Sequence, residues 1–311
     1  MGDFNTDSLA KAAEASGLII PEHVVEQFVA AIDAGKHVVL TGPPGTGKTT
    51  LAYLAAEVAQ QALMCTGYLP TTATTEWTTF ETIGGFQPTL EGLIFRPGMF
   101  TEAIESGKWL VVDEMNRANF DRAFGQLFTV LSGQAVVLPF NRRGQTKPVA
   151  IIPFGVEPPP NTDFIRVPAT WRIVATMNAF DKNLLFEMSF ALMRRFAFIE
   201  VVPPPDDAYT RLIEGPGDAV GKLLPLRQLK ELGPAVFIDA ASYVAKRASS
   251  APSESRLLYE VFYAYLLPQF EGISDEAALR LFRLVSGVFD EPEQVEAHRT
   301  IEEVLGVELP A

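Results

Sequence analysis

Short apolar runs alternate with helix-forming stretches through the first two thirds of the chain. Continuous apolar runs are typical of strands buried on both faces of a parallel sheet, whereas apolar residues three or four apart indicate one face of a helix. The predicted strands are residues 38–40, 69–75, 109–114, 171–176 and 196–202. Beyond residue 205 the pattern is helical. The alternation predicts an α/β fold, with a parallel sheet sandwiched by helices and a small all-α lid after it.

Helical stretches separate these predicted strands. Pro21 begins the first helix, which has apolar residues at helical spacing and ends before Gly35. A second helix is predicted over residues 49–61 and a short one over residues 101–106. A further stripe of apolar side chains is interpreted as core-facing: Phe120, Phe124, Leu127, Phe128 and Leu131. Residues 1–18 precede all of these and are predicted to form a loosely held arm.

Glycine and proline interrupt the pattern at two places and predict insertions. Residues 84–98 are typical of a glycine-punctuated hairpin, and residues 135–168 of a second hairpin followed by a loop. The proline run at 203–205 marks the end of the sheet domain. The predicted organisation is an arm (1–18), an α/β domain (19–205) and a helical lid (206–311).

Composition and charge exclude several classes of protein. The chain has 311 residues, 48% of them apolar, which is enough for a sizeable core. No stretch approaches 18 uninterrupted apolar residues, so no membrane span is expected, and no membrane is expected among the partners. The single cysteine, Cys65, excludes an intramolecular disulfide and favours a reducing, cytoplasmic location. A formal net charge of −13 opposes direct nucleic-acid binding through bulk electrostatics.

The segment between the first predicted strand and the 49–61 helix carries the most specific chemistry. It matches the pattern G-x-x-x-x-G-K-[ST] with Gly42, Pro43, Pro44, Gly45, Thr46, Gly47, Lys48 and Thr49. A glycine-rich turn before a helix exposes backbone N–H groups where phosphates bind. Lys48 is expected to reach the β- and γ-phosphates, and the Thr49 hydroxyl to hold Mg²⁺. The segment predicts a nucleoside-triphosphate site.

Polar residues follow two other predicted strands. Asp113 and Glu114 end one of them, and the carboxyl ends of parallel strands line the ligand crevice. Asp113 is expected to hold Mg²⁺ beside Thr49, through water, and Glu114 to activate the attacking water. Asn178 follows another strand and can position that water, although such residues are also common in turns and caps.

Two arginines, Arg194 and Arg195, precede the last predicted strand. An arginine that reaches the γ-phosphate bound by a neighbouring subunit can stabilise transition-state charge in trans. The residues alone leave this role open against a solvated or salt-bridged pair.

Four segments carry a further signal through their order along the chain: residues 42–49, 113–119, 177–181 and 191–196. This is the order found in AAA+ ATPases, and from about residue 20 to 203 the chain resembles the dynein-related, McrB-like branch of that family. The resemblance implies that Lys48 and Thr49 are Walker A residues. It implies that Asp113 and Glu114 form Walker B, and that Asn178 is sensor 1.

The same resemblance assigns three arginines. It makes Arg194 or Arg195 the arginine finger without choosing between them. Arg256 begins a lid helix and is the sensor 2 candidate, against the alternative of an ordinary exposed helical arginine, because the lid matches the family only in its helical character.

The resemblance implies ATP with Mg²⁺ as the cofactors, with GTP possible. McrB-like relatives include GTPases whose Asn-Thr-Ala-Asp segment has been linked to guanine choice. Residues 178–181 of this chain are Asn-Ala-Phe-Asp and depart at both middle positions. The base preference stays open, and ATP is expected as the usual nucleotide of the family.

Two surface features have open interpretations. The predicted hairpin tip at residues 141–147 is basic, and would either contact nucleic acid or an acidic partner or be solvated. Phe86 and Phe95 of the first hairpin would line the pore of a ring, or else pack against the domain.

The predicted function is an oligomeric AAA+ ATPase, a homo-oligomeric ring that remodels or moves an unidentified partner. The alternatives are a GTP-dependent motor subunit of a restriction system and a MoxR-like chaperone. A nucleotide-gated binding module without turnover and a small-molecule kinase also fit the phosphate loop alone.

Overall fold

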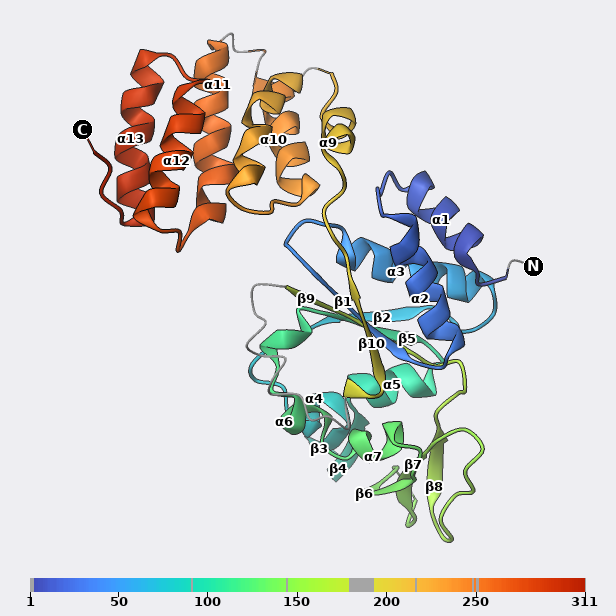
Figure 1. Ribbon diagram of the computed structural model, residues 1–311. Helices are drawn as coiled ribbons and strands as arrows, with labels where there is room; N and C mark the ends of the chain where they lie inside the picture. Colours follow the sequence, from blue (N-terminus) through green and yellow to red (C-terminus); the bar gives the residue numbers. More distant parts are fainter. Residues whose placement is uncertain are drawn as a thin grey trace. The chain divides into compact units, whose positions relative to one another are not determined.

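A computed structural model describes residues 3–90, 92–143, 145–178, 193–215, 217–247, 249 and 252–310 (Figure 1). The chain divides into two compact units. The first comprises Met1–Gly42 and Lys48–Val201, and the second comprises Pro43–Gly47 and Val202–Ala311. Within the described ranges, no helix combines the length and the apolar character needed to cross a bilayer.

A five-stranded sheet forms the centre of the first unit. Its strand order is β10-β1-β9-β5-β2, and the neighbouring strands are parallel. The strands are β1 (His37–Gly42), β2 (Tyr68–Thr72), β5 (Trp109–Asp113), β9 (Ile173–Asn178) and β10 (Phe196–Glu200). The three central strands consist almost entirely of buried residues, as expected for a sheet covered on both faces. The predicted α/β fold is confirmed.

Two cores lie on opposite faces of this sheet. Successive side chains of a strand point to opposite faces, so Val38 and Leu40 of β1 join one core and Val39 joins the other. Figure 1 shows α1 (Thr6–Ala15), α2 (Glu22–Asp33) and α3 (Lys48–Gln61) on one face of the sheet and α5 (Met99–Glu105) on the other. The other short helices of this unit, in the described residues, are α4 (Thr79–Thr82), η1 (Met115–Arg117), α6 (Phe120–Phe124) and α7 (Leu127–Leu131).

The N-terminal residues differ from the loosely held arm that the sequence predicted. They form helix α1 (Thr6–Ala15), whose Leu9 and Ala13 are buried. Asn5 accepts a hydrogen bond from the Ser8 backbone, and the Ser8 side chain accepts one from the Asn5 backbone, which closes a capping box. The helix was missed because its apolar positions are mostly alanines, which favour helix but give a weak hydrophobic pattern.

The predicted apolar stripe forms two short helices rather than one. Gly125 separates α6 from α7 with a φ of 45°, and a Cβ there would lie 2.4 Å from Cγ2 of Thr79. Phe124 and Leu127 are buried as expected, whereas the side chain of Phe120 lies outside the described part of the chain.

Two small sheets occupy the predicted insertions. β3 (Gly84–Thr89) and β4 (Gly92–Pro97) pair antiparallel, as the hairpin prediction required. The second insertion holds β6 (Val136–Asn141), β7 (Pro148–Ile152) and β8 (Asp163–Arg166), with β8 parallel to β7. The sequence predicted a loop in place of β8, because four residues beyond a proline-rich connection are too short to show a strand pattern.

The second unit is helical beyond Val202 and has a core of its own. In the described residues its elements are α9 (Asp206–Leu212), η3 (Asp218–Gln228), α10 (Pro234–Arg247), α11 (Glu254–Val261), η5 (Phe262–Leu266), η6 (Leu267–Phe270), α12 (Asp275–Ser286) and α13 (Glu291–Leu305). Aromatic and leucine side chains fill the core, among them Tyr209, Phe237, Phe262 and Phe270. The predicted change to an all-helical C-terminal region is confirmed.

A buried histidine makes the stability of the first unit depend on pH. His37 accepts a hydrogen bond at Nδ1 from the Ile173 N–H, at 3.0 Å. Burial, assisted by the charge of Arg172, lowers the pKa of His37 to about 3. The unfolded chain takes up a proton near pH 6.5 and the folded chain does not, so stability present above pH 6.5 is lost as the pH falls toward 3.

We therefore expect His37→Asn to flatten the acid side of the stability curve. Asparagine keeps an acceptor for Ile173 but does not titrate. Between pH 6.5 and pH 5 the wild-type free energy of unfolding should fall by about 2 kcal/mol more than that of the variant. Urea unfolding at several pH values measures this, with exposed His23→Asn as the control. Equal slopes for wild type and His37→Asn would contradict the role of His37.

Candidate functional site

The phosphate-loop segment forms a tight turn between β1 and α3. Gly45 and Gly47 have φ values of 74° and 85°, a left-handed conformation that other residues rarely adopt. The hydroxyl of Thr46 donates to the carbonyl of Pro43 at 3.0 Å within this turn. The strand, glycine-rich turn and helix that the sequence predicted are therefore the observed local structure.

Lys48 begins α3, and its side chain reaches back to the last residue of β1. Its Nζ donates to the Gly42 carbonyl at 2.9 Å, and the residue is only 6% exposed. Burial lowers the pKa of Lys48 to about 8, against a smaller opposing effect of the Asp113 charge. A polyphosphate bound at the turn would stabilise this buried ammonium.

Two hydroxyl groups from different elements donate to Oδ1 of Asp113. The hydroxyl of Thr49, at the start of α3, donates to this oxygen at 2.9 Å. The hydroxyl of Thr176, on β9, donates to the same oxygen. The structure thus brings together the two predicted Mg²⁺ ligands and adds Thr176, which the sequence analysis did not select.

Glu114 directly follows β5 and has an unusual backbone conformation. Its φ of 52° and ψ of 44° lie in the left-handed region, which costs a non-glycine residue about 1–2 kcal/mol. Its N–H donates to Oγ1 of Thr176 at 3.1 Å. Its carboxylate forms an ion pair with Arg117, through Nε at 3.0 Å and Nη2 at 3.0 Å. The predicted water-activating carboxylate is thus held by an arginine three residues further along.

Asn178 ends β9 at the carboxyl edge of the sheet. It lies opposite Gly42 in the register of β1 and β9, and so beside the first residue of the phosphate-loop segment. Residues 179–181, on which the base preference depended, and residues 191–192 lie outside the described part of the chain.

The two arginines before β10 have different surroundings. Nε of Arg195 donates to the Leu131 carbonyl at 2.9 Å, and the side chain is half-buried. The Arg194 side chain is exposed and makes no hydrogen bond or ion pair with any residue that the structure describes. The carbonyl of Arg194 accepts a hydrogen bond from Nζ of Lys36 at 2.9 Å. Arg195 is thus hydrogen-bonded to its own domain, whereas the Arg194 side chain is exposed.

Both arginines lie at the amino edge of the sheet. The Arg195 carbonyl accepts a hydrogen bond from the N–H of His37, the first residue of β1, whereas Gly42 ends that strand. Five residues of strand, about 17 Å at ~3.3 Å each, separate the two ends. The arginines and the phosphate-loop segment of one chain therefore lie at opposite edges.

Arg256 lies in the second unit at the start of α11. It forms ion pairs with Glu260 at 3.5 Å and Glu296 at 2.8 Å, and its guanidinium lies 5.2 Å from the ring centroid of Tyr259. Two carboxylates of its own unit thus hold the guanidinium. The sensor 2 assignment stays a prediction.

The two surface features with open interpretations make internal contacts. Arg142 of the basic tip forms ion pairs with Glu105 and, at 2.9 Å, with Asp163, which neutralise part of its charge. Phe86 and Phe95 both contact the Phe140 ring, with centroids 5.2 and 5.1 Å apart. The hairpin rings therefore pack against β6 of the second insertion, and a place in the pore of a ring stays a prediction.

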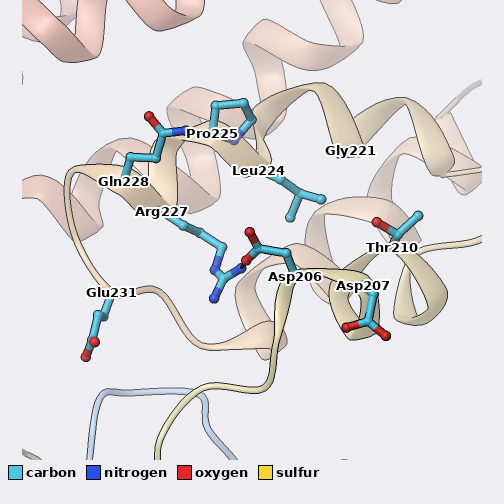
Figure 2. A pocket seen from close by; sticks show the side chains of 9 residues that line it. All are labelled: Asp206, Asp207, Thr210, Gly221, Leu224, Pro225, Arg227, Gln228 and Glu231. Carbon is cyan, nitrogen blue, oxygen red and sulfur yellow. Dashed lines mark hydrogen bonds and ion pairs between the residues drawn. The ribbon is translucent and has the colours of Figure 1, made fainter.

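A groove of about 620 Å³ lies in the second unit, between α9 and η3 (Figure 2). The guanidinium of Arg227 lies 3.6 Å from the ring centroid of Tyr209 and forms an ion pair with Asp206. The groove is lined by Asp206, Asp207, Thr210, Gly221, Leu224, Pro225, Arg227, Gln228 and Glu231. These residues match no motif of fixed spacing, so the sequence alone does not indicate the groove.

The parallel sheet, the glycine-rich turn and the Thr49–Asp113 contact together define the class of P-loop nucleotide-binding proteins. A family model, AAA domain (dynein-related subfamily), matches residues 37–196, just over half of the chain. The chain belongs to this family, which confirms the resemblance that the motifs indicated. Because AAA domains bind nucleotide, the chain is a nucleotide-binding protein.

Individual relatives are more distant. The chain is 27% identical over 210 residues to the EcoKMcrB subunit of a type IV methyl-directed restriction enzyme from Escherichia coli (strain K12). The match covers 64% of this chain and 42% of that protein, so the chain spans less than half the length of this relative. Among solved structures, NtrX from Brucella abortus in complex with ATP has a TM-score of 0.48 at 16% identity, covering 91% of this chain and 67% of that one.

Proposed function

We propose that the chain hydrolyses ATP with Mg²⁺ as an oligomeric ring and uses the energy to remodel or move a partner macromolecule. One observation carries the proposal. Thr49 lies at the end of the phosphate-loop segment, and its hydroxyl is 2.9 Å from a carboxylate oxygen of Asp113. A hydroxyl and a carboxylate in this position are what a P-loop site uses to hold Mg²⁺ beside the nucleotide. Membership of the AAA family supports the nucleotide-hydrolysing part.

The residues of the site fit a magnesium triphosphate. Backbone N–H groups of the turn and of the start of α3 would bind phosphate oxygens, and the Lys48 ammonium would offset their charge. Hydroxyl and carboxylate oxygens are hard ligands that suit Mg²⁺, which commonly takes one or two protein ligands besides phosphate and water. Thr49 and Asp113 would hold the ion, which neutralises charge on the β- and γ-oxygens when bound.

Glu114 and Asn178 would place the attacking water. Glu114 directly follows Asp113 at the end of β5, so its carboxylate would act as the base for the attacking water. The Glu114 carboxylate forms an ion pair with Arg117, so acting on the water would require it to turn from that arginine. The Asn178 amide, beside Gly42, would hold the water in line with the bond that breaks.

Arg194 would complete the site of a neighbouring copy. It is exposed and lies at the amino edge of the sheet, about 17 Å along β1 from its own phosphate-loop segment. An arginine at that distance fits action in trans better than action in cis. The interface between two copies would then bring the amino edge of one sheet to the carboxyl edge of the next.

A GTP-dependent motor subunit is the second candidate, since the relative at 27% identity is named as a subunit of a restriction enzyme. Calorimetry with MgATP and MgGTP, paired with phosphate release from each, separates the two. We expect tighter binding and faster release with ATP. Preference for GTP would support the restriction-type motor, and binding without release of phosphate would contradict an enzymatic role.

A further inference from the structure

The hydroxyl of Thr176 joins the two acidic residues of the candidate site. It donates its single proton to Oδ1 of Asp113 and accepts a hydrogen bond from the N–H of Glu114 at 3.1 Å. Thr176 is 2% exposed, so water does not compete for these bonds. With its donor used and a lone pair occupied, the hydroxyl has a fixed orientation.

The position of Thr176 at the end of a sheet ladder explains why a side chain makes these bonds. The register of β5 and β9 ends with Val112 opposite Ala175, one residue before Thr176. Beyond it β5 turns away at Glu114, whose φ is 52°. The Glu114 N–H therefore leaves the ladder, and the Thr176 hydroxyl accepts it in place of a backbone carbonyl. A strained conformation persists only where its surroundings hold it.

Thr176 would keep its role when the nucleotide binds. Oδ1 of Asp113 accepts hydrogen bonds from both Thr49 and Thr176. A Thr49 hydroxyl that binds Mg²⁺ would do so through an oxygen lone pair, so its proton could still be donated to Oδ1 of Asp113. The bond from Thr176 would hold the Asp113 carboxylate in place independently of the ion, while the same hydroxyl fixes the backbone from which Glu114 extends.

We propose that Thr176 is a positioning residue that sets Asp113 for Mg²⁺ and Glu114 for the attacking water through one hydroxyl group. This inference rests on the proposed ATPase function. Because Thr176 would affect Mg²⁺-dependent nucleotide binding as well as turnover, its role and the ATPase function can fail separately.

The test compares Thr176→Val, which keeps the β-branched shape and loses the hydroxyl, with Thr176→Ser, which keeps the hydroxyl. Binding of a fluorescent ATP analogue is titrated with Mg²⁺ and with EDTA, and phosphate release is measured at saturating MgATP. In EDTA we expect both variants to match wild type within about threefold, since the loop and Lys48 are unchanged. With Mg²⁺, Thr176→Val should lose the tightening of binding, and its kcat should fall by about 10- to 100-fold.

Thr176→Ser should recover most of both losses. Thr101→Val is the matched control, because Thr101 is a buried threonine whose hydroxyl donates to the Ile83 carbonyl at 2.7 Å, away from the acidic pair. This control should keep both Mg²⁺-dependent binding and kcat.

Normal kcat and normal Mg²⁺ tightening in Thr176→Val would overturn the inference. Loss of binding in EDTA as well would also overturn it, because that result indicates collapse of the whole site. If wild type binds MgATP but does not hydrolyse it, the ATPase proposal fails, and the Mg²⁺ titration still decides the role of Thr176.

Discussion

Glu114→Gln is expected to bind MgATP about as tightly as wild type while turning it over at least ~100-fold more slowly. Glutamine has the shape of glutamate but cannot take a proton from water. The phosphate-loop segment, Lys48 and the Thr49–Asp113 contact are untouched, so affinity should be preserved. Phosphate release at saturating MgATP and binding of a fluorescent analogue measure the two quantities separately.

The matched control for this change is Glu102→Gln, which removes an exposed carboxylate on α5 and should leave both quantities unchanged. Full turnover in Glu114→Gln would mean that another group activates the water. Loss of affinity in the same variant would show that Glu114 binds nucleotide and does not act on the water.

Arg194→Ala should lower kcat by about 10³-fold with little change in affinity for MgATP, whereas Arg195→Ala should act mainly on stability. An arginine finger contributes about 10³–10⁵ to the rate of phosphoryl transfer. The Arg194 side chain is exposed, whereas Nε of Arg195 donates to the Leu131 carbonyl. Removing that internal bond should lower the melting temperature. Kinetics and thermal unfolding of both variants test the assignment.

Arg194→Lys gives a sharper control, since lysine keeps the positive charge but lacks the planar guanidinium that donates two hydrogen bonds to a phosphate. It should remain well below wild type in kcat. The assignment reverses if Arg195→Ala loses turnover at an unchanged melting temperature while Arg194→Ala stays active.

The phosphate-binding half of the site could be predicted from sequence because its geometry is local. Eight consecutive residues determine the turn, and the apolar run before Gly42 and the helix after Thr49 determine where its N–H groups point. Asp113 could be placed beside Thr49 for a similar reason, because parallel strands bring their carboxyl ends to one edge.

The rest of the site depends on contacts between strands that carry no spacing signal. Thr176 and Asp113 are 63 residues apart, and their bond follows from the pairing of β5 with β9. The ion pair of Glu114 with Arg117 depends on a left-handed turn that the acidic pair does not reveal. The difference between Arg194 and Arg195 arises from one carbonyl, that of Leu131, on a helix far away in sequence.

Completion of each site by a neighbouring copy is the central claim, and mixing two inactive variants tests it most directly. Glu114→Gln and Arg194→Ala are purified separately, and phosphate release is measured for each alone and for an equal mixture after subunit exchange. In the mixture half of the chains keep Glu114 and the other half keep Arg194. About a quarter of the subunit interfaces therefore pair an intact Glu114 with an intact Arg194 from the next chain, and activity should return to about a quarter of the wild-type rate. A mixture no more active than the average of its two components would contradict the claim.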